Sequence, residues 1–274
     1  MSMLRDAARR VADLLGRDSG LVRLLRPLYE ELLDWTTGGR GIPWTINGVE
    51  YRIDPRCRHM MGAAYDAHVA AWLSQRIQPG DLCIDVGANV GVYVLQLAHW
   101  SRPNGRVIAV EPNPRTREIL RKHIRLNGLT DRVEVVAAAA GERLGEAELF
   151  AVDIDGMSRL GSPNPALEDQ AIALPVPVIT LDDLCETRRL DPRWLVIDIE
   201  GFEFSALLGA RGLLSRKTAR PGVVVEMHPD AWDAAGTSRA AAETLLREYG
   251  LKVEPLSGQD DAFTQHGHVA LVSQ

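Results

Sequence analysis

The segment Leu82–Gly91, LCIDVGANVG, constrains the fold of this chain more than any other feature. An apolar run of strand length is followed by Gly87, Asn89 and Gly91, and an apolar helical pattern then continues to about Trp100. Glycines directly after a buried strand let the backbone turn sharply and approach a ligand at the carboxyl edge of a sheet. The segment therefore predicts a strand, a glycine turn and a helix, with a ligand site at the turn.

Two acidic residues accompany this turn. Asp85 lies two positions before Gly87 and is expected to point into the ligand space, and Glu111 follows the next predicted strand, Arg106–Val110. A carboxylate at that place can accept both hydroxyl groups of a ribose. An acid beside the turn repels the pyrophosphate of a dinucleotide but attracts a cationic ligand. The pattern therefore favours S-adenosylmethionine, whose sulfonium and ammonium groups are positive, over NAD.

From Ala63 onward the chain alternates between helical and strand-like patterns, which is typical of an α/β fold. Residues 137–180 break this alternation with extra strand-like runs around a turn-rich loop. Because long insertions in compact domains are more often functional than accidental, we expect this one to form a wall of an acceptor pocket. The predicted elements are helices at Tyr65–Arg76 and Asn113–Asn127, strands at Arg132–Val136, Glu146–Val152 and Val176–Ile179, and a loop at Asp155–Pro165.

Residues 1–62 are predicted to form an extension that precedes the main domain, residues 63–274. Leucines and arginines alternate at helical spacing over residues 1–34, and Pro43–Ile53 predicts a strand pair that turns at Asn47-Gly48. Acidic residues interrupt the basic face of the helical segment, so packing on the core or on another subunit is favoured over a membrane surface. We expect a cap over the site or a contact in a homo-oligomer.

Composition narrows the class of protein and its surroundings. The net charge is −6, from 31 basic and 37 acidic residues, and it disfavours nucleic acid as a partner, because such proteins carry a basic stripe. Three widely spaced cysteines without a C-x-x-C pattern indicate neither a cysteine-ligated metal site nor a disulfide framework. We find no apolar run of the roughly 20 residues of a membrane span and no signal peptide. The cytoplasm is the expected compartment.

A second set of polar residues follows two further apolar strands. Asp198 and Glu200 lie two apart in LVIDIEGFEF, and Glu226 and His228 lie two apart in VVVEMHP, so each pair is expected on one side of its strand. Carboxylates at this edge could orient an acceptor hydroxyl, accept its proton or bind a divalent cation. His228 is a candidate general base, because an ordinary imidazole pKa is close to neutral. The remaining histidines are interpreted as structural: His59, His68, His99, His123, His266 and His268.

The motifs IDVGANVG, AVEPNP, VIDIEGFEFSALLGA and VVVEMHP resemble, in order and spacing, those of the FkbM family of S-adenosylmethionine-dependent methyltransferases. The resemblance covers about residues 50–274. It implies a class I, Rossmann-like methyltransferase fold, which is a mostly parallel seven-stranded sheet with helices on both faces and an antiparallel strand near one edge. It also implies O-methylation of a hydroxyl group on a small molecule, such as a polyketide, another secondary metabolite, a sugar or a glycolipid.

The resemblance carries site residues onto this chain. The motifs imply that the glycine turn surrounds the methionine part of the cofactor, that Glu111 binds the ribose, and that residues 138–141 pass the adenine. Many relatives have a lysine two positions before the aspartate of D-x-E-G, where this chain has Val196, so the catalytic roles transfer less directly. The implied cofactor-binding residues are Asp85, Gly87, Ala88, Asn89, Gly91, Glu111, Pro112, Asn113 and Ala138, and the catalytic candidates are Asp198, Glu200, Glu226 and His228.

The expected chemistry is a single displacement in which oxygen, carbon and sulfur are aligned. An alcohol needs a base or a metal ion within hydrogen-bond reach of its proton, and we expect His228 or Asp198 as the base and Glu200 to hold the acceptor. A role for a divalent metal is left open by the sequence. Two other readings share parts of this pattern: a nucleic-acid or protein methyltransferase shares the cofactor, and an NAD-dependent oxidoreductase shares the sheet.

Overall fold

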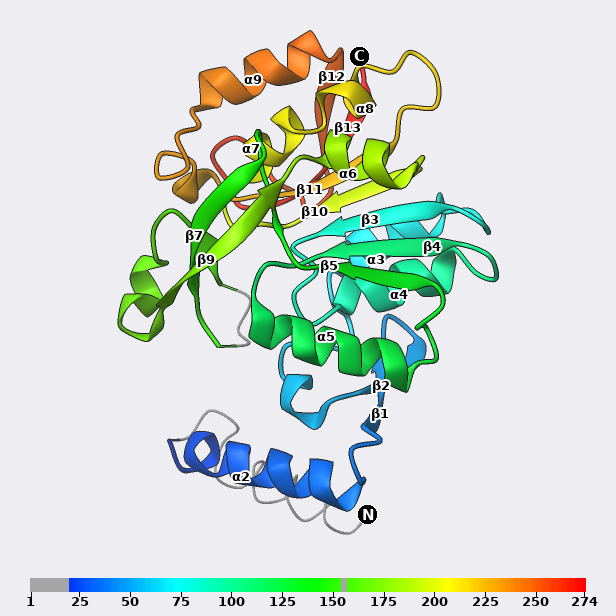
Figure 1. Ribbon diagram of the computed structural model, residues 1–274, viewed down its shortest axis with the longest axis vertical. Helices are drawn as coiled ribbons and strands as arrows, with labels where there is room; N and C mark the ends of the chain where they lie inside the picture. The colour runs from blue at the N-terminus through cyan, green and yellow to red at the C-terminus, as the bar shows by residue number, and fades with distance from the viewer. Residues whose placement is uncertain (1–19, 154–156) are drawn as a thin grey trace. The chain divides into compact units, whose positions relative to one another are not determined.

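The computed structural model describes residues 20–153 and 157–274 (Figure 1). The chain divides into two compact units, residues 1–65 and 66–274, close to the boundary at residue 62 expected from the sequence. Among the described helices, none is long and apolar enough to cross a membrane. The helical prediction for residues 1–19 falls outside the described part of the chain.

The first unit contains a helix and the predicted strand pair. Asn47 and Gly48 form the turn, and both have positive φ angles, 46° and 80°, as a two-residue hairpin turn requires. Apolar side chains such as Ile46 and Ile53 are fully buried. The role of this unit as a cap or an oligomer contact stays a prediction. Its elements are α2 (Gly20–Thr36), β1 (Ile42–Ile46), β2 (Val49–Ile53) and the short 3-10 helix η1 (Pro55–Cys57).

The second unit is built on a seven-stranded sheet, which confirms the predicted fold class. Neighbouring strands are parallel from β11 through β10, β3 and β4 to β5, whereas β13 runs antiparallel to both β11 and β12. The predicted strand Arg106–Val110 agrees with β4 at both ends. In spatial order the strands are β12 (Leu251–Pro255), β13 (Gly267–Ser273), β11 (Gly222–Met227), β10 (Trp194–Ile197), β3 (Leu82–Val86), β4 (Arg106–Val110) and β5 (Val133–Val136).

Helices cover both faces of this sheet: α3, α4 and α5 lie on one side in Figure 1, and α6 to α9 lie on the other. Several begin at a side-chain cap, since Asn113, Thr180 and Ser238 each accept a backbone N–H of the first turn. The bounds are α3 (Ala67–Ser74), α4 (Val92–Trp100), α5 (Pro114–Leu126), α6 (Leu181–Arg188), α7 (Glu203–Leu208), α8 (Arg211–Leu214), α9 (Arg239–Glu248) and the 3-10 helix η3 (Pro229–Ala231).

The alternation of side chains along β3 and β4 decides which of them join the hydrophobic core between the seven-stranded sheet and α6 to α9. Ile84 and Val86 of β3 pack with Ile108 and Val110 of β4 and with the apolar faces of α6 to α9 in one buried cluster. Because side chains alternate along a strand, Asp85 lies on the opposite face of the sheet, toward α4. The carboxyl ends of the parallel strands meet at one edge, where the polar residues that follow them come together.

Residues 137–180 form a second sheet, where the sequence predicted an irregular insertion with two extra strands. The strand β7 pairs with β9 along its whole length, and β9 begins at Ile172, four residues before the predicted start. Residues 154–156 of the predicted loop lie outside the described residues. The elements are β6 (Ala139–Ala140), β9 (Ile172–Ile179), β7 (Gly145–Ala151) and β8 (Arg159–Leu160), with the 3-10 helix η2 (Pro165–Gln170).

Gly87 offers a test of how closely the strands are packed at the site. Its φ is +85°, and a Cβ there would lie 1.7 Å from the carbonyl oxygen of Asp198. Gly80 has a similar φ of +94° but open space around it. We expect Gly80→Ala to cost about 1 kcal/mol from backbone strain alone, and Gly87→Ala at least about 3 kcal/mol. Urea unfolding of both variants checks this, and equal losses would contradict the packing argument.

Candidate active site

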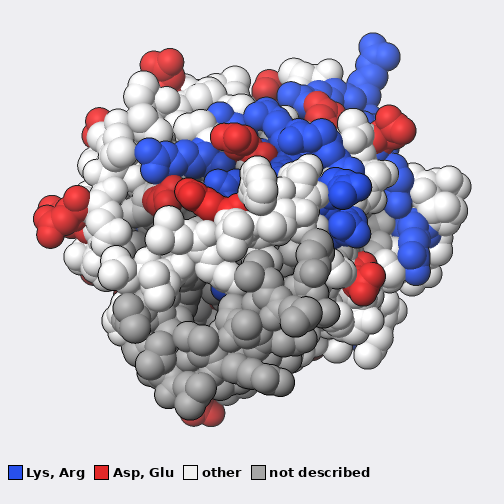
Figure 2. Space-filling model, turned by 90° about the horizontal axis from the view of Figure 1, so that it is seen from below, with Lys and Arg blue, Asp and Glu red and all other residues white. Residues whose placement is uncertain are grey.

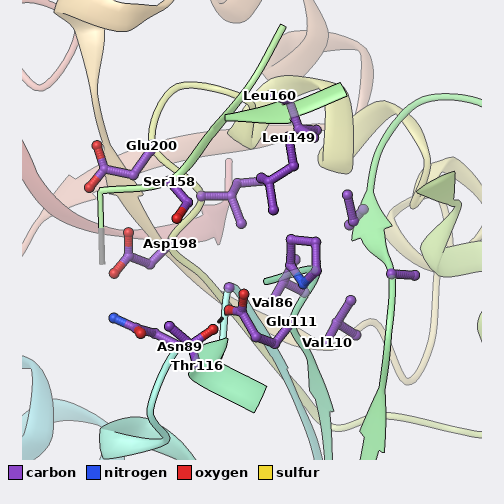
Figure 3. A pocket seen from close by; sticks show the side chains of 16 residues that line it. Val86, Asn89, Val110, Glu111, Thr116, Leu149, Ser158, Leu160, Asp198 and Glu200 are labelled. Carbon is purple, nitrogen blue, oxygen red and sulfur yellow. Dashed lines mark hydrogen bonds between the residues drawn. The ribbon is translucent and has the colours of Figure 1, made fainter. Parts of the chain in front are cut away.

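A pocket of about 640 Å³, including its open mouth, lies at the carboxyl edge of the sheet (Figure 3). The carboxylates of Asp198 and Glu200 lie together on one side of it, apart from the aliphatic side chains of Val86 and Val110. The lining residues are Val86, Gly87, Asn89, Val110, Glu111, Pro112, Thr116, Ala138, Ala139, Ala140, Leu149, Ser158, Leu160, Asp198, Ile199 and Glu200.

Glu111 joins the two loops that form the floor of this pocket. Its Oε2 accepts the backbone N–H of Asn89 and its Oε1 accepts the backbone N–H of Asn113, each at 2.7 Å. Burial raises the pKa of the carboxyl, and these two N–H groups act in the opposite direction. Each oxygen keeps a further lone pair, so the carboxylate remains able to accept hydroxyl groups of a ligand.

Asp85 occupies a different place from the one expected. The side chain is only 2% exposed and does not line the pocket. Burial first, and then the charges of Asp198 and Glu111, raise the pKa of Asp85 well above its ordinary value, while a backbone N–H of Val94 in α4 acts against the rise. Its Oδ2 has no hydrogen-bond partner among the described residues. Asp85 therefore lies beneath the glycine turn rather than in the ligand space.

Three further residues that were expected to bind the cofactor have structural roles or positions outside the pocket lining. A Cβ at Gly91 would lie 2.5 Å from Cδ1 of Leu120 in α5, so close packing of protein atoms requires this glycine as well as Gly87. Ala88 is buried and does not line the pocket. Asn113 caps α5 and donates from its side chain to the carbonyl of Val152 and to Ser158 Oγ. Asn113 thus ties the second sheet to Glu111 and the start of α5.

Asp198 and Glu200 do converge, but a turn brings them together and strand alternation does not. β10 ends at Ile197, and Glu200 has a φ of 55°. Both carboxylates line the pocket. Glu200 Oε2 is 3.3 Å from a guanidinium nitrogen of Arg159, which comes from β8. Burial first, and then the nearby Glu226, raise the pKa of Asp198 well above its ordinary value.

His228 is held by a buried carboxylate that sequence reasoning missed. Its Nδ1 is 2.6 Å from Oε1 of Glu203, which is fully buried and also accepts from Trp232 Nε1 and from the N–H of Gly201. Burial lowers the pKa of His228, but Glu203 and the carboxylates of Asp198 and Glu200 raise it to about 9. The imidazole is therefore protonated at neutral pH in this arrangement. A near-neutral general base, as expected from the sequence, does not fit it.

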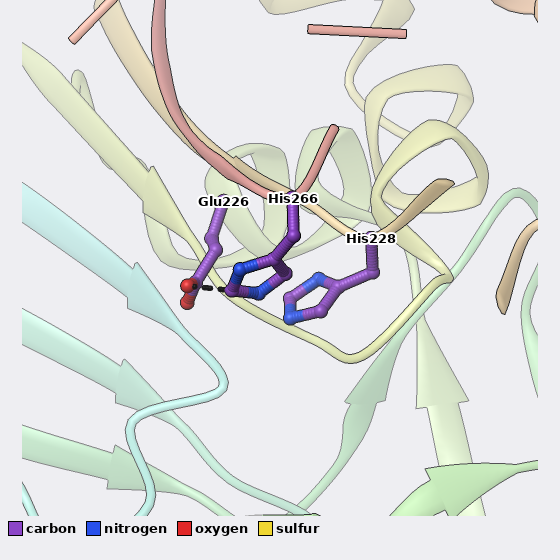
Figure 4. Close-up of side chains that lie close together, drawn as sticks. All are labelled: Glu226, His228 and His266. Atoms are coloured by element: carbon purple, nitrogen blue, oxygen red, sulfur yellow. Dashed lines mark ion pairs between the residues drawn. The ribbon is translucent and has the colours of Figure 1, made fainter. Parts of the chain in front are cut away.

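Two histidines interpreted as structural lie beside Glu226. His266 Nε2 is 3.2 Å from Glu226 Oε1, and His268 Nε2 is 3.7 Å from Glu226 Oε2 (Figure 4). The rings of His228 and His266 have centroids 4.7 Å apart. Burial lowers the pKa of His268 to about 4. The sequence interpreted both side chains as structural and gave no sign of this proximity, which arises from the register between distant strands.

One side of the pocket combines an unused hydrogen-bond acceptor with small side chains. Asn89 Oδ1 is buried without a hydrogen-bond partner among the described residues, which leaves an acceptor for a ligand donor. The small side chains of Ala138, Ala139 and Ala140 also line the pocket. Sequence reasoning did not identify the wall residues Leu149, Ser158 and Leu160, because they belong to the second sheet.

Comparisons with known proteins agree with this architecture. The family described as the methyltransferase FkbM domain matches residues 85–253. FkbM methyltransferase from Methylobacillus flagellatus KT superimposes with a TM-score of 0.50 at 20% identity, over 72% of this chain and 44% of that one, which is less than half of that protein's length. No curated protein matches the chain.

Two further solved structures superimpose more loosely. Aeropyrum pernix fibrillarin, solved with natively bound S-adenosyl-L-methionine, has a TM-score of 0.44 and 14% identity over 85% of this chain and 82% of that one. Precorrin-6y C5,15-methyltransferase from Geobacter metallireducens GS-15 has a TM-score of 0.43 and 15% identity, over 76% of this chain and 88% of that one.

The sheet order, with one antiparallel strand between β11 and β12, defines a class I S-adenosylmethionine-dependent methyltransferase fold. Within that class, the family match extends over more than half of the sequence. The chain belongs to the FkbM methyltransferase domain family.

The raised pKa of Asp85 predicts a pH-dependent stability. A carboxyl with a raised folded-state pKa stabilises the fold fully below its unfolded value, here 3.8, and loses that contribution as the pH rises through the folded value. Asp85→Asn removes this loss, so the variant should have a higher melting temperature than the natural protein at pH 7. The expected increase is about 2–4 °C for each ~1 kcal/mol gained in the free energy of unfolding.

The difference should shrink as the pH falls toward about 4, near the ordinary aspartate pKa. Thermal melts across this range, with the exposed Asp131→Asn as the control for loss of a charge, check the sign. A variant that is less stable at pH 7 and gains relative stability in acid would contradict the interpretation of Asp85.

Proposed function

We propose that this protein transfers the methyl group of S-adenosylmethionine to a hydroxyl group of a small molecule. The observation that carries the proposal is one pocket with two different ends. Glu111 and Asn89 offer acceptors suited to a nucleoside, and Asp198 and Glu200 offer carboxylates where a second molecule can enter. A cofactor and an acceptor can therefore meet in one cavity, as a single displacement requires.

The cofactor would bind through residues of the first two strand ends and the segment after β5. We assign the ribose hydroxyls to Glu111, the methionine part to the turn at Gly87 and Asn89, and the adenine to the surroundings of Pro112 and Ala138. When bound, S-adenosylmethionine supplies a methyl group that its sulfonium already makes electrophilic. The protein has to orient the acceptor and exclude water.

The polar end of the pocket would prepare the acceptor oxygen. Asp198 lines the pocket and is our candidate for the group that accepts the hydroxyl proton. Glu200 would hold the acceptor, and Arg159 at 3.3 Å fixes this carboxylate in place. The protonated His228, 3.9 Å from a carboxylate oxygen of each acid, offsets their negative charge.

The second sheet would decide which acceptor enters. Leu149 and Leu160 present aliphatic surface to the pocket, and Ser158 presents a hydroxyl. Such a wall suits an acceptor with an apolar body and few polar groups. A tailoring reaction on a secondary metabolite or a glycolipid is consistent with this surface.

A nucleic acid is the second candidate acceptor, because basic side chains gather on one face of the molecule, with acidic ones among them (Figure 2). Helix α5 alone carries five basic residues against one acidic residue. Among these residues, Arg115 pairs with Asp153 and Arg117 donates to the carbonyl of Glu111, so they are already engaged within the protein. We therefore favour a small molecule. RNA binding that falls steeply with added salt would favour the alternative.

We also propose a reducing compartment such as the cytoplasm. All three cysteines are buried, and Cys83 and Cys185 are free. Burial raises the pKa of Cys185 to about 11, so this thiol behaves as a small core residue.

Cofactor binding is tested directly by calorimetry with S-adenosylhomocysteine, the product form of the cofactor. We expect micromolar binding, no binding of NAD, and about tenfold weaker binding in Glu111→Gln, because a hydrogen bond to a charged group is lost. Glu118→Gln, which removes an exposed carboxylate on α5, is the matched control. Equal affinity of both variants would remove Glu111 from the cofactor site.

Methyl transfer is tested by release of S-adenosylhomocysteine with a panel of hydroxylated acceptors. For any acceptor that reacts, Asp198→Asn should lower kcat by at least about 100-fold, the usual contribution of a general base. The affinity for S-adenosylhomocysteine should stay within about threefold, since the assigned cofactor contacts do not include this carboxyl. Glu146→Gln on the exposed edge of β7 serves as the control. Unchanged turnover in Asp198→Asn would exclude Asp198 as the base.

A further inference from the structure

Two short patterns on adjacent antiparallel strands place four side chains of metal-binding type on one face. Glu226 and His228 are two residues apart at the end of β11, and His266 and His268 are two residues apart at the start of β13. Side chains two apart in a strand share a face. The register pairs Glu226 with His268 and Met227 with Gly267, so His228 and His266 follow as neighbours just beyond the ladder.

Three of these side chains approach one another closely enough to share an ion. One ligand atom from each of Glu226, His228 and His266 lies within 4.8 Å of the others. Figure 4 shows the two rings and the carboxylate pointing into one small space. Glu226 and His228 are 16% and 9% exposed at the side chain, whereas His266 is 57% exposed, so the cluster is supported from inside and open on one side.

The environment of His228 is the one that metal-binding imidazoles commonly have. Its Nδ1 is bonded to the buried Glu203, which fixes the ring and directs Nε2 toward the acids of the site. A carboxylate on the far nitrogen sets the tautomer and orientation of a histidine ligand. Trp232 Nε1 and the N–H of Gly201 hold Glu203 in turn, so the support extends into the core.

We propose that Glu226, His228 and His266 form a binding site for a divalent first-row transition-metal ion such as Zn²⁺. Binding of the ion would displace the proton that His228 carries on Nε2 in the metal-free protein. Two imidazoles and one carboxylate are then a donor set that such ions accept, with open positions for water or substrate. Mg²⁺ and Ca²⁺ prefer oxygen donors, so neither is the expected ion. The exposed side of His266 leaves a path for the ion to enter.

The role we assign to the ion rests on the proposed methyl transfer. His228 Nε2 lies 3.9 Å from oxygens of Asp198 and Glu200, both of which line the pocket, so the ion would lie next to the acceptor. An acceptor hydroxyl bound to the ion becomes more acidic. Its O–H bond breaks with the proton passing to Asp198, the O–CH₃ bond forms, and the S–CH₃ electron pair returns to sulfur, which leaves neutral S-adenosylhomocysteine.

Metal binding can be measured without cofactor or acceptor. The full chain, freed of any purification tag and stripped with a chelator, is titrated with Zn²⁺ by calorimetry and with Co²⁺ by visible absorption. We expect one equivalent bound per chain, Zn²⁺ at least tenfold tighter than Mg²⁺, and a visible Co²⁺ band typical of nitrogen ligation. His266→Gln should weaken Zn²⁺ binding by at least tenfold with little effect on folding, because this side chain is mostly exposed. Glu226→Gln should also weaken Zn²⁺ binding by at least tenfold.

His59→Gln, which removes an exposed histidine of the first unit, is the matched control and should bind as the natural protein does. Absence of one tight equivalent, equal binding by His266→Gln and His59→Gln, or tighter binding of Mg²⁺ than of Zn²⁺ would each overturn the proposal. A failure of the proposed function shows itself differently, as absence of S-adenosylhomocysteine binding whether or not the metal is bound.

Discussion

The pocket depends on one buried carboxylate that accepts two backbone N–H groups. Glu111 holds the turn after β3 through Asn89 and the start of α5 through Asn113. Without this acceptor, both N–H groups would lie in the interior unpaired, which costs more than the net gain from an ordinary hydrogen bond. The turn after β3 and the second sheet, which Asn113 reaches with its side chain, are therefore positioned by the same group.

Charge balance governs the opposite side. Many relatives carry a lysine at the position of Val196, which is buried in β10. This chain therefore has no cation at that position. Two cations from elsewhere stand beside the acids instead, Arg159 from the second sheet and His228 after β11. Because these groups are largely buried, removal of one cation would leave carboxylates unpaired in a poorly solvated site.

The sequence predicted those parts of the structure whose cause is local. The glycine turn, β4 and α5 follow from residues near one another in the chain. The positions of His266 and His268 do not, because they depend on the register of β13 against β11 across some forty residues. Burial explains the other differences: it removes Asp85 from the ligand space, and the buried Glu203 changes the protonation of His228.

The second sheet begins and ends at neighbouring points of the fold. Ala139 and Ala140 pair with Val178 and Ile179, and the N–H of Gly141 continues the contact to Ile179. Since both ends of the excursion are fixed side by side, its middle can lengthen or shorten at small entropic cost without disturbing the main sheet. The second sheet can therefore change in length while the strand ends that form the other side of the pocket keep their positions.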